Sequence, residues 1–210
     1  MEKLIMDSAT KILITGFERF GEFESNPSQT LVEALNKEPF KIQLKEAGFD
    51  VHAHVLPVEY NKAFESLKVL IEKQNPQIVL SFGVAQNREK ICLERIAVNH
   101  RSILTKDNSG LAPDTQSVLE GGPDGVFSNI TDLDELSMSL NEKGWRVRVS
   151  LTAGDYVCNA LMYEACLLAK EKGFAYDFIH IPKEELSRAL NMKKIKSLPY
   201  FVMDLLELLT

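Results

Sequence analysis

The 210-residue sequence predicts an α/β domain with a mainly parallel sheet covered by helices on both faces. Two observations favour this class. Strand-like and helix-like segments alternate along the chain, and the clearest central strand is an unbroken apolar run, Ile78-Val79-Leu80. The composition, with 45% hydrophobic and 26% charged residues, is that of an ordinary soluble globular protein. This length favours one domain over residues 1–210.

The individual elements follow from periodicity and from helix start signals such as Asn26-Pro27-Ser28. The expected strands are Lys11 to Thr15, Phe40 to Lys45, Val51 to Leu56, Gln77 to Phe82, Ile91 to Val98, Trp145 to Leu151 and Asp177 to Ile181. The expected helices are Ser28 to Asn36, Tyr60 to Gln74, Leu133 to Lys143, Tyr156 to Lys172 and most of the tail from Glu184 to Leu209, interrupted at Pro199. The polar, Gly- and Pro-rich stretch from Arg101 to Ser128 indicates a long excursion at one edge.

Charge and cysteine content narrow the class of protein. The net charge is −6 and no basic run is present, so we expect no nucleic-acid surface. The first ten residues lack a long apolar stretch, so we expect no signal core and no membrane span. The three cysteines form neither a paired framework nor a Cys-x-x-Cys metal spacing. Free thiols in the reducing cytoplasm and no metal are the expectation.

Cys158 is the cysteine whose position suggests chemistry. In parallel sheets, sites gather at the carboxyl ends of strands, here the loops after Thr15, Leu151 and Ile179. Cys158 follows such a loop and falls in the first turn of the next helix, where unpaired N–H groups and the helix dipole stabilise a thiolate. A structural role remains the alternative. Cys92 and Cys166 lie in apolar segments and are expected to be buried hydrophobes.

Two further side chains could assist a nucleophile. His180 ends an apolar strand, where it could meet a helix-start cysteine, or it could simply bond to backbone. Period two places Glu94 on an apolar face with Cys92, Ile96 and Val98, and a carboxylate there costs free energy unless it is partnered. Glu94 could orient an imidazole, or it could pair with a neighbouring cation.

Four segments resemble pyroglutamyl peptidase type I, a family of cysteine peptidases. They are Thr15-Gly16-Phe17 with Phe20-Gly21 and Asn26-Pro27-Ser28, then Phe82-Gly83-Val84 with Leu93 to Asn99, then Thr152 to Asn159, and finally Phe178 to Pro182. Each segment alone is modest evidence. All four occur in the family's order at compatible spacing, and the likeness runs along nearly the whole chain.

The resemblance implies a three-layer α/β/α sandwich of the phosphorylase/hydrolase-like type. It implies a thiol protease of the omega peptidase class that removes N-terminal pyroglutamate from peptides, with a thioacyl-enzyme intermediate and no cofactor. Cys158 would be the nucleophile, His180 the base and acid, and Glu94 the group that orients His180. The implied substrate-binding residues are Phe17, Phe20, Asn26, Val84, Tyr156 and Val157. Relatives include both homo-oligomers and monomers, so the oligomeric state stays open.

The sequence also departs from the family pattern. Leu104 stands where many bacterial members have an arginine thought to support the oxyanion, and Arg101 or Lys106 are candidate substitutes. Asp155 replaces a neutral residue, and we expect it to act as a helix N-cap and to oppose thiolate formation. These departures motivate an alternative from another class: a weak or inactive homologue that acts as a binding or regulatory protein.

Overall fold

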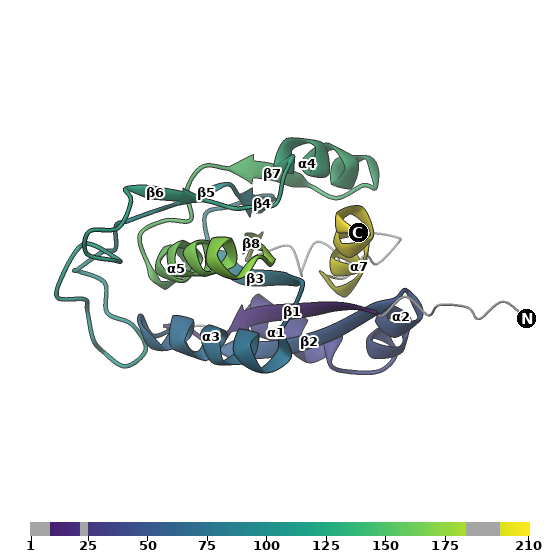
Figure 1. Ribbon diagram of the computed structural model, residues 1–210, viewed down its shortest axis with the longest axis horizontal. Coiled ribbons are helices and arrows are strands. Elements are labelled where there is room, and N and C mark those ends of the chain that lie inside the picture. The colour runs from purple at the N-terminus through teal and green to yellow at the C-terminus, as the bar shows by residue number, and fades with distance from the viewer. Residues whose placement is uncertain (1–8, 22–24, 184–197) are drawn as a thin grey trace, which may run out of the picture.

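The computed structural model describes residues 9–21, 25–183 and 198–210, and its centre is a six-stranded sheet (Figure 1). The strand order is β2-β1-β3-β8-β4-β7. The strands are β1 (Thr10–Phe17), β2 (Phe49–Leu56), β3 (Ile78–Ala85), β4 (Ile91–Glu94), β7 (Val147–Ser150) and β8 (Ala175–Pro182). A separate two-stranded sheet pairs β5 (Ile96–Val98) with β6 (Gly125–Phe127).

The main sheet is mixed and mainly parallel, as predicted. Strands β2, β1, β3 and β8 are parallel neighbours, whereas β4 is antiparallel to β8 and parallel to β7. The register places Glu94, the last residue of β4, opposite Phe178 of β8. Glu94 therefore lies beside the middle of β8. Its position could not be predicted from the tendency of sites to gather at the carboxyl ends of parallel strands, because β4 is antiparallel to β8.

Helices cover both faces of the sheet, which gives the expected three layers. One face, called here the α7 face, packs against α1 (Pro27–Leu35), α2 (Phe40–Glu46), α4 (Leu133–Glu142) and α7 (Leu198–Leu209). The other, the α5 face, packs against α3 (Lys62–Gln74), α5 (Val157–Lys172) and the β5–β6 pair. Figure 1 shows α5 and α7 on opposite sides of β3 and β8.

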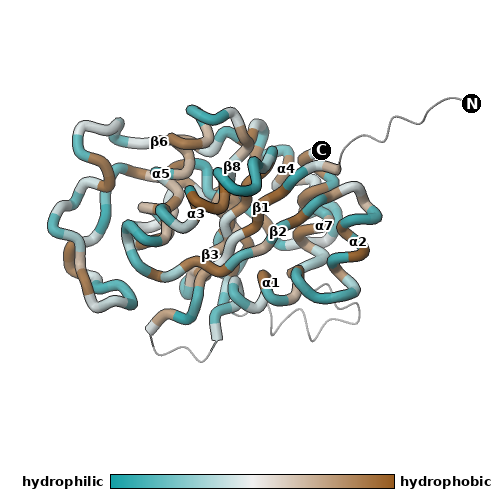
Figure 2. Tube along the Cα trace, turned by 60° about the horizontal axis from the view of Figure 1, so that its bottom comes forward, coloured by the Kyte–Doolittle hydropathy of each residue, from teal (hydrophilic) through white to brown (hydrophobic). Residues whose placement is uncertain are grey.

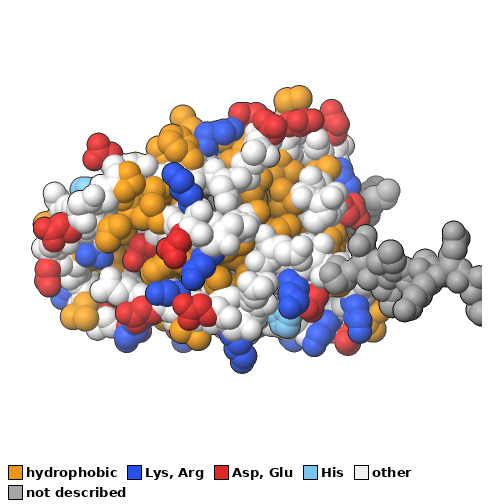
Figure 3. Space-filling view, in the orientation of Figure 1, with side chains coloured by type: hydrophobic (Ala, Val, Ile, Leu, Met, Phe, Trp, Pro, Cys, Tyr) orange, Lys and Arg blue, Asp and Glu red, His pale blue; other side chains and the backbone are white. Residues whose placement is uncertain are grey.

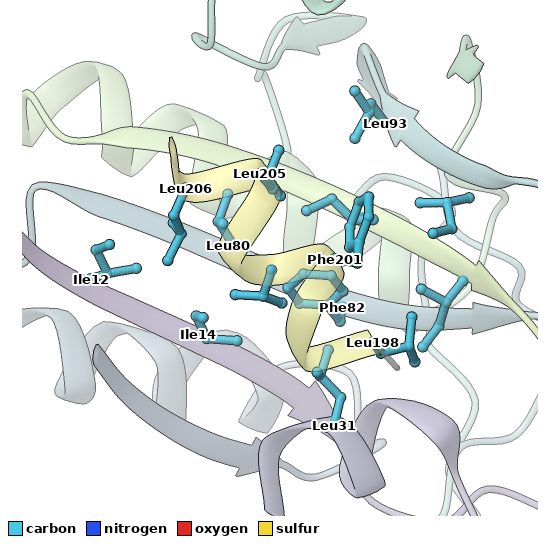
Figure 4. Close-up of a cluster of buried hydrophobic side chains, with 14 of the residues drawn as sticks. Ile12, Ile14, Leu31, Leu80, Phe82, Leu93, Leu198, Phe201, Leu205 and Leu206 are labelled. Carbon is cyan, nitrogen blue, oxygen red and sulfur yellow. The ribbon is translucent and has the colours of Figure 1, made fainter. Parts of the chain in front are cut away.

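The α7 face is held together by apolar contacts. Figure 4 shows Ile14 of β1 and Phe82 of β3 around Phe201 and Leu205 of α7, and all four are at most 1% exposed. Fully burying a side chain of this size contributes about 1.5–3 kcal/mol. Figure 2 shows the corresponding hydrophobic stretch along β1, with hydrophilic stretches in the surface loops.

The predicted strand from Phe40 to Lys45 is wrong, because these residues form helix α2. The alternation of Phe40, Ile42 and Leu44 fits a strand, but only Leu44 is buried and Ile42 is 50% exposed. The ring of Phe40 instead packs edge-on against Tyr200, with centroids 5.0 Å apart. The two residues used for packing, Phe40 and Leu44, are spaced i, i+4, which is helical spacing.

The single strand expected from Ile91 to Val98 is split at Arg95 into β4 and β5. The Arg95 N–H donates to the Ser150 carbonyl at 2.8 Å, and its side chain pairs with Asp134 at 2.7 Å. The predicted common face of Cys92, Glu94, Ile96 and Val98 therefore ends at Glu94. The excursion that follows returns to the sheet through β6.

In the tail, α7 is described from Leu198 to Leu209, and Pro199 lies within this helix. The remainder of the helix expected from residue 184 lies outside the described residues. Among those described, no helix is long and apolar enough to cross a bilayer, and no group of three or more His, Cys, Asp or Glu side chains could hold a metal ion. Cationic and anionic side chains are interspersed on the face shown in Figure 3.

Candidate active site

A pocket of about 310 Å³ opens where β1 and β3 end and α5 begins. Cys158 lines it, and so do all six residues that the resemblance assigned to substrate binding. The resemblance assigned no binding role to the other lining residues, which are Ser25, Pro27, Thr30, Val58, Gln86 and Lys183. Most of these come from segments that meet only in the fold.

Aromatic rings form the walls of this pocket. The rings of Phe20 and Tyr156 lie 5.0 Å apart, and Tyr60 meets Tyr156 edge-on at 5.4 Å. Phe17 is 3% exposed, and its ring centroid lies 6.3 Å from that of Phe178. Walls of this kind suit a flat, uncharged group better than an ion.

Asn26 combines a structural role with a place in the pocket. It is the N-cap of α1, and its Oδ1 accepts from the backbone N–H of Ser28 at 2.9 Å and from the Ser28 hydroxyl at 2.8 Å. Its Nδ2 donates to the Glu18 carbonyl at 2.8 Å. A side-chain amide has two N–H donors, so this network uses one and fixes the direction of the other.

Cys158 is the second residue of α5, in the turn whose N–H groups have no intrahelical acceptor. The predicted N-cap role of Asp155 is wrong: the N-cap is Tyr156, and it makes no side-chain cap hydrogen bond. The preceding turn requires Gly154, whose φ of 86° lies in the left-handed region. Asp155 contributes instead through its carbonyl, which accepts from the Ser102 N–H at 2.7 Å.

Gly83 lets the cysteine approach the sheet. A Cβ at this position would lie 3.1 Å from the Cys158 sulfur and 2.8 Å from the Phe178 ring. Gly83 is also the register partner of His180 on the neighbouring strand β8. The missing side chain therefore makes room for the sulfur beside the strand position that carries the histidine.

Glu94 and His180 are in direct contact in the interior. His180 Nδ1 lies 2.8 Å from Glu94 Oε1, and the two residues are 4% and 0% exposed. Glu94 Oε2 is buried without a hydrogen-bond partner among the described residues. The histidine is not simply a strand-end residue bonded to backbone, since its ring nitrogen is held by a buried carboxylate.

The surroundings of Cys158 oppose its ionisation. Burial, together with the negative charge of Glu94, raises the pKa of the thiol to about 12, although the residue as a whole keeps partial exposure. A backbone hydrogen bond at the start of α5 lowers this pKa but is outweighed. The resting cysteine is therefore a neutral thiol at pH 7, and a base must remove its proton during attack. All three cysteines are free, with Cys92 and Cys166 buried as predicted.

Arg88, in the loop between β3 and β4, is a site residue that the sequence did not reveal. Its guanidinium has four contacts, two through each terminal nitrogen: Nη1 donates to Ser150 Oγ at 2.7 Å and to Cys92 Sγ at 3.2 Å, and Nη2 donates to the Thr152 carbonyl at 2.7 Å and lies 3.2 Å from Glu94 Oε1. No local pattern indicated a role for Arg88, because it lies among exposed polar residues and two of its partners are more than 60 positions away.

The long excursion reaches back over the pocket. Asn108 Nδ2 donates to the Glu18 carboxylate at 2.9 Å, and that carboxylate also accepts from the Val58 N–H at 3.1 Å. The Asp107 carboxylate accepts from the Tyr60 N–H at 3.1 Å. These bonds join three segments distant in sequence into one rim, which only the folded chain brings together.

Leu104, which departs from the family pattern, and its candidate substitutes Arg101 and Lys106 lie in different environments. Leu104 is 89% exposed. The Arg101 guanidinium donates to Thr115 and lies over the Tyr60 ring, 5.9 Å from its centroid. Lys106 takes part through its carbonyl, which accepts from the Tyr156 hydroxyl at 3.0 Å. The excursion is thereby tied to the aromatic wall of the pocket.

Comparison with known proteins identifies the family of the chain. The family model described as pyroglutamyl peptidase matches residues 10–204. Pyrrolidone-carboxylate peptidase 1 of Saccharolobus solfataricus is 37% identical over 187 residues, covering 89% of this chain and 85% of the relative. A pyrrolidone-carboxylate peptidase of Coprothermobacter proteolyticus is 38% identical over 175 residues, covering 82% and 81%.

Solved structures show the same fold. The pyrrolidone carboxyl peptidase of Fervidobacterium islandicum superposes with a TM-score of 0.81 at 28% identity, covering 94% of this chain and 97% of that one. Pyroglutamyl peptidase I of Bacillus amyloliquefaciens gives a TM-score of 0.79 at 28% identity, covering 95% and 92%. The extent of these matches, together with the aromatic pocket around Cys158, shows that the chain belongs to the pyroglutamyl peptidase family of cysteine peptidases.

Proposed function

We propose that the protein hydrolyses the amide bond after an N-terminal pyroglutamyl residue, with Cys158, His180 and Glu94 as its catalytic triad. The observation that carries this proposal is the buried 2.8 Å contact between His180 Nδ1 and Glu94 Oε1, because His180 is the register partner of Gly83, next to which the Cys158 sulfur packs. A nucleophile, a base and a group that orients the base are the parts that such hydrolysis requires.

The pocket supports the substrate class. A pyroglutamyl residue is a neutral lactam without an ammonium group, so it fits between the rings of Phe17, Phe20 and Tyr156 without a counter-ion. The second Nδ2 hydrogen of Asn26 would donate to the lactam carbonyl. The backbone at Val84 would bind the ring N–H, and Val157 would complete the wall next to the nucleophile.

The reaction begins with proton transfer from the Cys158 thiol to His180 Nε2. Glu94 accepts a hydrogen bond from Nδ1–H and thereby keeps Nε2 free to act as the base. The sulfur bonds to the scissile carbonyl carbon, and the resulting oxyanion is stabilised by N–H groups in the first turn of α5. The C–N bond breaks, His180 protonates the leaving amine, and a thioacyl-enzyme remains.

Water completes the cycle. His180 takes a proton from the attacking water, the C–S bond breaks, and the proton returns to the Cys158 sulfur as free pyroglutamate leaves. Since burial raises the thiol pKa to about 12, His180 must remove the Cys158 proton as the sulfur attacks.

The test is hydrolysis of a fluorogenic pyroglutamyl amide, with a prolyl amide as the control substrate. We expect turnover of the pyroglutamyl compound only, and Cys158→Ala should abolish it while Cys166→Ala, inside α5, keeps it. Loss of activity in both variants alike would point to damage of the fold. No turnover by the wild-type protein at high concentration would refute the peptidase proposal. Tight binding of pyroglutamyl peptides without turnover would then favour the binding-protein alternative.

A further inference from the structure

Two polar side chains contact the Glu94 carboxylate directly among the described residues. Its Oε1 faces both His180 Nδ1 at 2.8 Å and Arg88 Nη2 at 3.2 Å, and its side chain is 0% exposed. Oε2 is buried with no hydrogen-bond partner in the described part of the chain. A buried carboxylate without a cation takes up a proton, so a nearby guanidinium favours the anionic form.

Several charged or titratable groups interact with Glu94 or neighbour it along the chain, and they lie on different elements. They are Arg88 in the loop after β3, Cys92 on β4, Arg95 after β4, Arg148 on β7, Cys158 on α5, and Asp177 and His180 on β8. Arg95 pairs with Asp134, and the Arg148 Nε donates to Cys92 Sγ at 3.3 Å. Of the three arginines, Arg88 is the one in ion-pair contact with Glu94.

The same guanidinium also holds the segment that leads to the nucleophile. Arg88 Nη1 donates to Ser150 Oγ at the end of β7, and Nη2 donates to the Thr152 carbonyl, both at 2.7 Å. Ser150 and Thr152 begin the turn before α5, whose second residue is Cys158. A shift of this turn would move the sulfur relative to His180.

We propose that Arg88 is a positioning residue for the hydrolytic reaction: it keeps Glu94 anionic and fixes the turn that precedes Cys158. This inference rests on the proposed triad. If Glu94 carried a proton, its hydroxyl would donate to His180 Nδ1 and the ring hydrogen would move to Nε2. Nε2 could then no longer accept the proton of Cys158, so loss of Arg88 would disable the base without touching the substrate.

Arg88→Met removes the charge while keeping much of the side-chain volume. We expect kcat to fall about 100-fold with KM nearly unchanged, because a misplaced catalytic group typically costs about that much. The acid limb of the pH profile of kcat/KM should move to higher pH. Arg88→Lys keeps the positive charge but replaces the planar guanidinium, whose two terminal nitrogens hold Glu94 and the turn at once, by a single ammonium group. We therefore expect an acid limb near that of the wild type and a kcat reduced about 10-fold.

Arg148→Met is the matched control, because it removes the other guanidinium on Cys92 but no ion pair with Glu94. The charge of Arg148 acts on Glu94 only from a greater distance, so we expect kcat and the acid limb to change much less than in Arg88→Met. A folded Arg88→Met protein with wild-type kcat and acid limb, even with a lowered Tm, would overturn the proposal, as would equal losses in Arg148→Met. If Arg88→Met does not fold, Arg88→Lys decides, and an unchanged kcat would again overturn it. Failure of the triad itself shows separately, as turnover that survives Cys158→Ala.

Discussion

The α7 face and the α5 face of the sheet are built from alternate residues of the same strands, yet they differ in chemistry. On β8, Ile179 and Ile181 pack into the apolar cluster under α7, while Phe178 and His180 point to the opposite side. On β3, Phe82 fills the α7 core and its neighbour Gly83 leaves space for a sulfur. Period-two alternation lets one strand serve packing and chemistry at once.

Several buried polar side chains on the α5 face are held by hydrogen bonds. Thr15 Oγ1 donates to Ser81 Oγ at 2.9 Å. Asn159, next to the nucleophile, accepts from the Val98 N–H at 3.0 Å and donates to the carbonyls of Val98 and His100 at 2.8 Å. A buried polar group left unpaired costs about 1–3 kcal/mol, so such networks have few alternative arrangements. The comparison predicts that changes at the polar residues around Cys158 on the α5 face alter activity, whereas changes in the apolar core of the α7 face alter stability.

The largest expected effect is that of Glu94→Gln on the α5 face. The amide keeps the shape but cannot hold the histidine in the required tautomer, so we expect kcat to fall about 10⁴-fold. Steady-state kinetics measures the loss, and circular dichroism checks that the variant is folded. The exposed Glu89→Gln is the control. A kcat for Glu94→Gln within tenfold of the wild-type value would contradict the prediction that this part of the α5 face controls activity.

Leu205→Ala tests the α7 face. Leu205 is 1% exposed, and a large-to-small change in such a core costs about 2–5 kcal/mol of unfolding free energy. Urea unfolding should show this loss, while kcat stays unchanged wherever the variant is folded. Leu208→Ala on the same helix, where the side chain is 38% exposed, should cost much less. A folded Leu205→Ala variant with reduced kcat would show that the faces are coupled.

Alkylation of Cys158 measures how strongly the α5 face suppresses its thiolate. With a pKa raised to about 12, the thiolate fraction should increase about tenfold per pH unit. Iodoacetamide should therefore inactivate the protein faster at each step from about pH 7 to 10, and pyroglutamate should protect it. Peptide mapping should find Cys92 and Cys166 unlabelled in the folded protein. A rate that is already constant below about pH 9 would indicate a preformed thiolate.

Glu164→Gln should give the smallest effect. Burial, with the charge of Glu65, raises the pKa of Glu164 on α5 to about 7 despite the opposing charge of Arg101. Its ionisation is harder in the folded state, so stability falls as pH rises from about 4.5 to 7. We expect Glu164→Gln to raise Tm by about 2–4 °C at pH 8 and not at pH 4. The exposed Glu171→Gln is the control, and an equal gain at both pH values would contradict this account.

Local sequence pattern predicted most elements because their packing is periodic. The helix expected from Tyr156 and the strand expected from Gln77 were found because their apolar residues are the ones buried in the fold. The pattern failed for α2, where alternation from Phe40 to Leu44 suited a strand equally well. A seven-residue segment holds too few repeats to distinguish the two periods, and contacts with distant residues decided the outcome.

The sequence by itself determined the α/β class and, through family motifs, the three residues of the proposed triad. It could not determine the reversed direction of β4, which brings Glu94 beside β8. Nor could it place Arg88 between Glu94 and the turn before Cys158. The physical reason is that periodicity and motifs are properties of neighbouring residues, whereas strand order and ion pairing in a low-dielectric interior join residues far apart. Only the tertiary structure decided those.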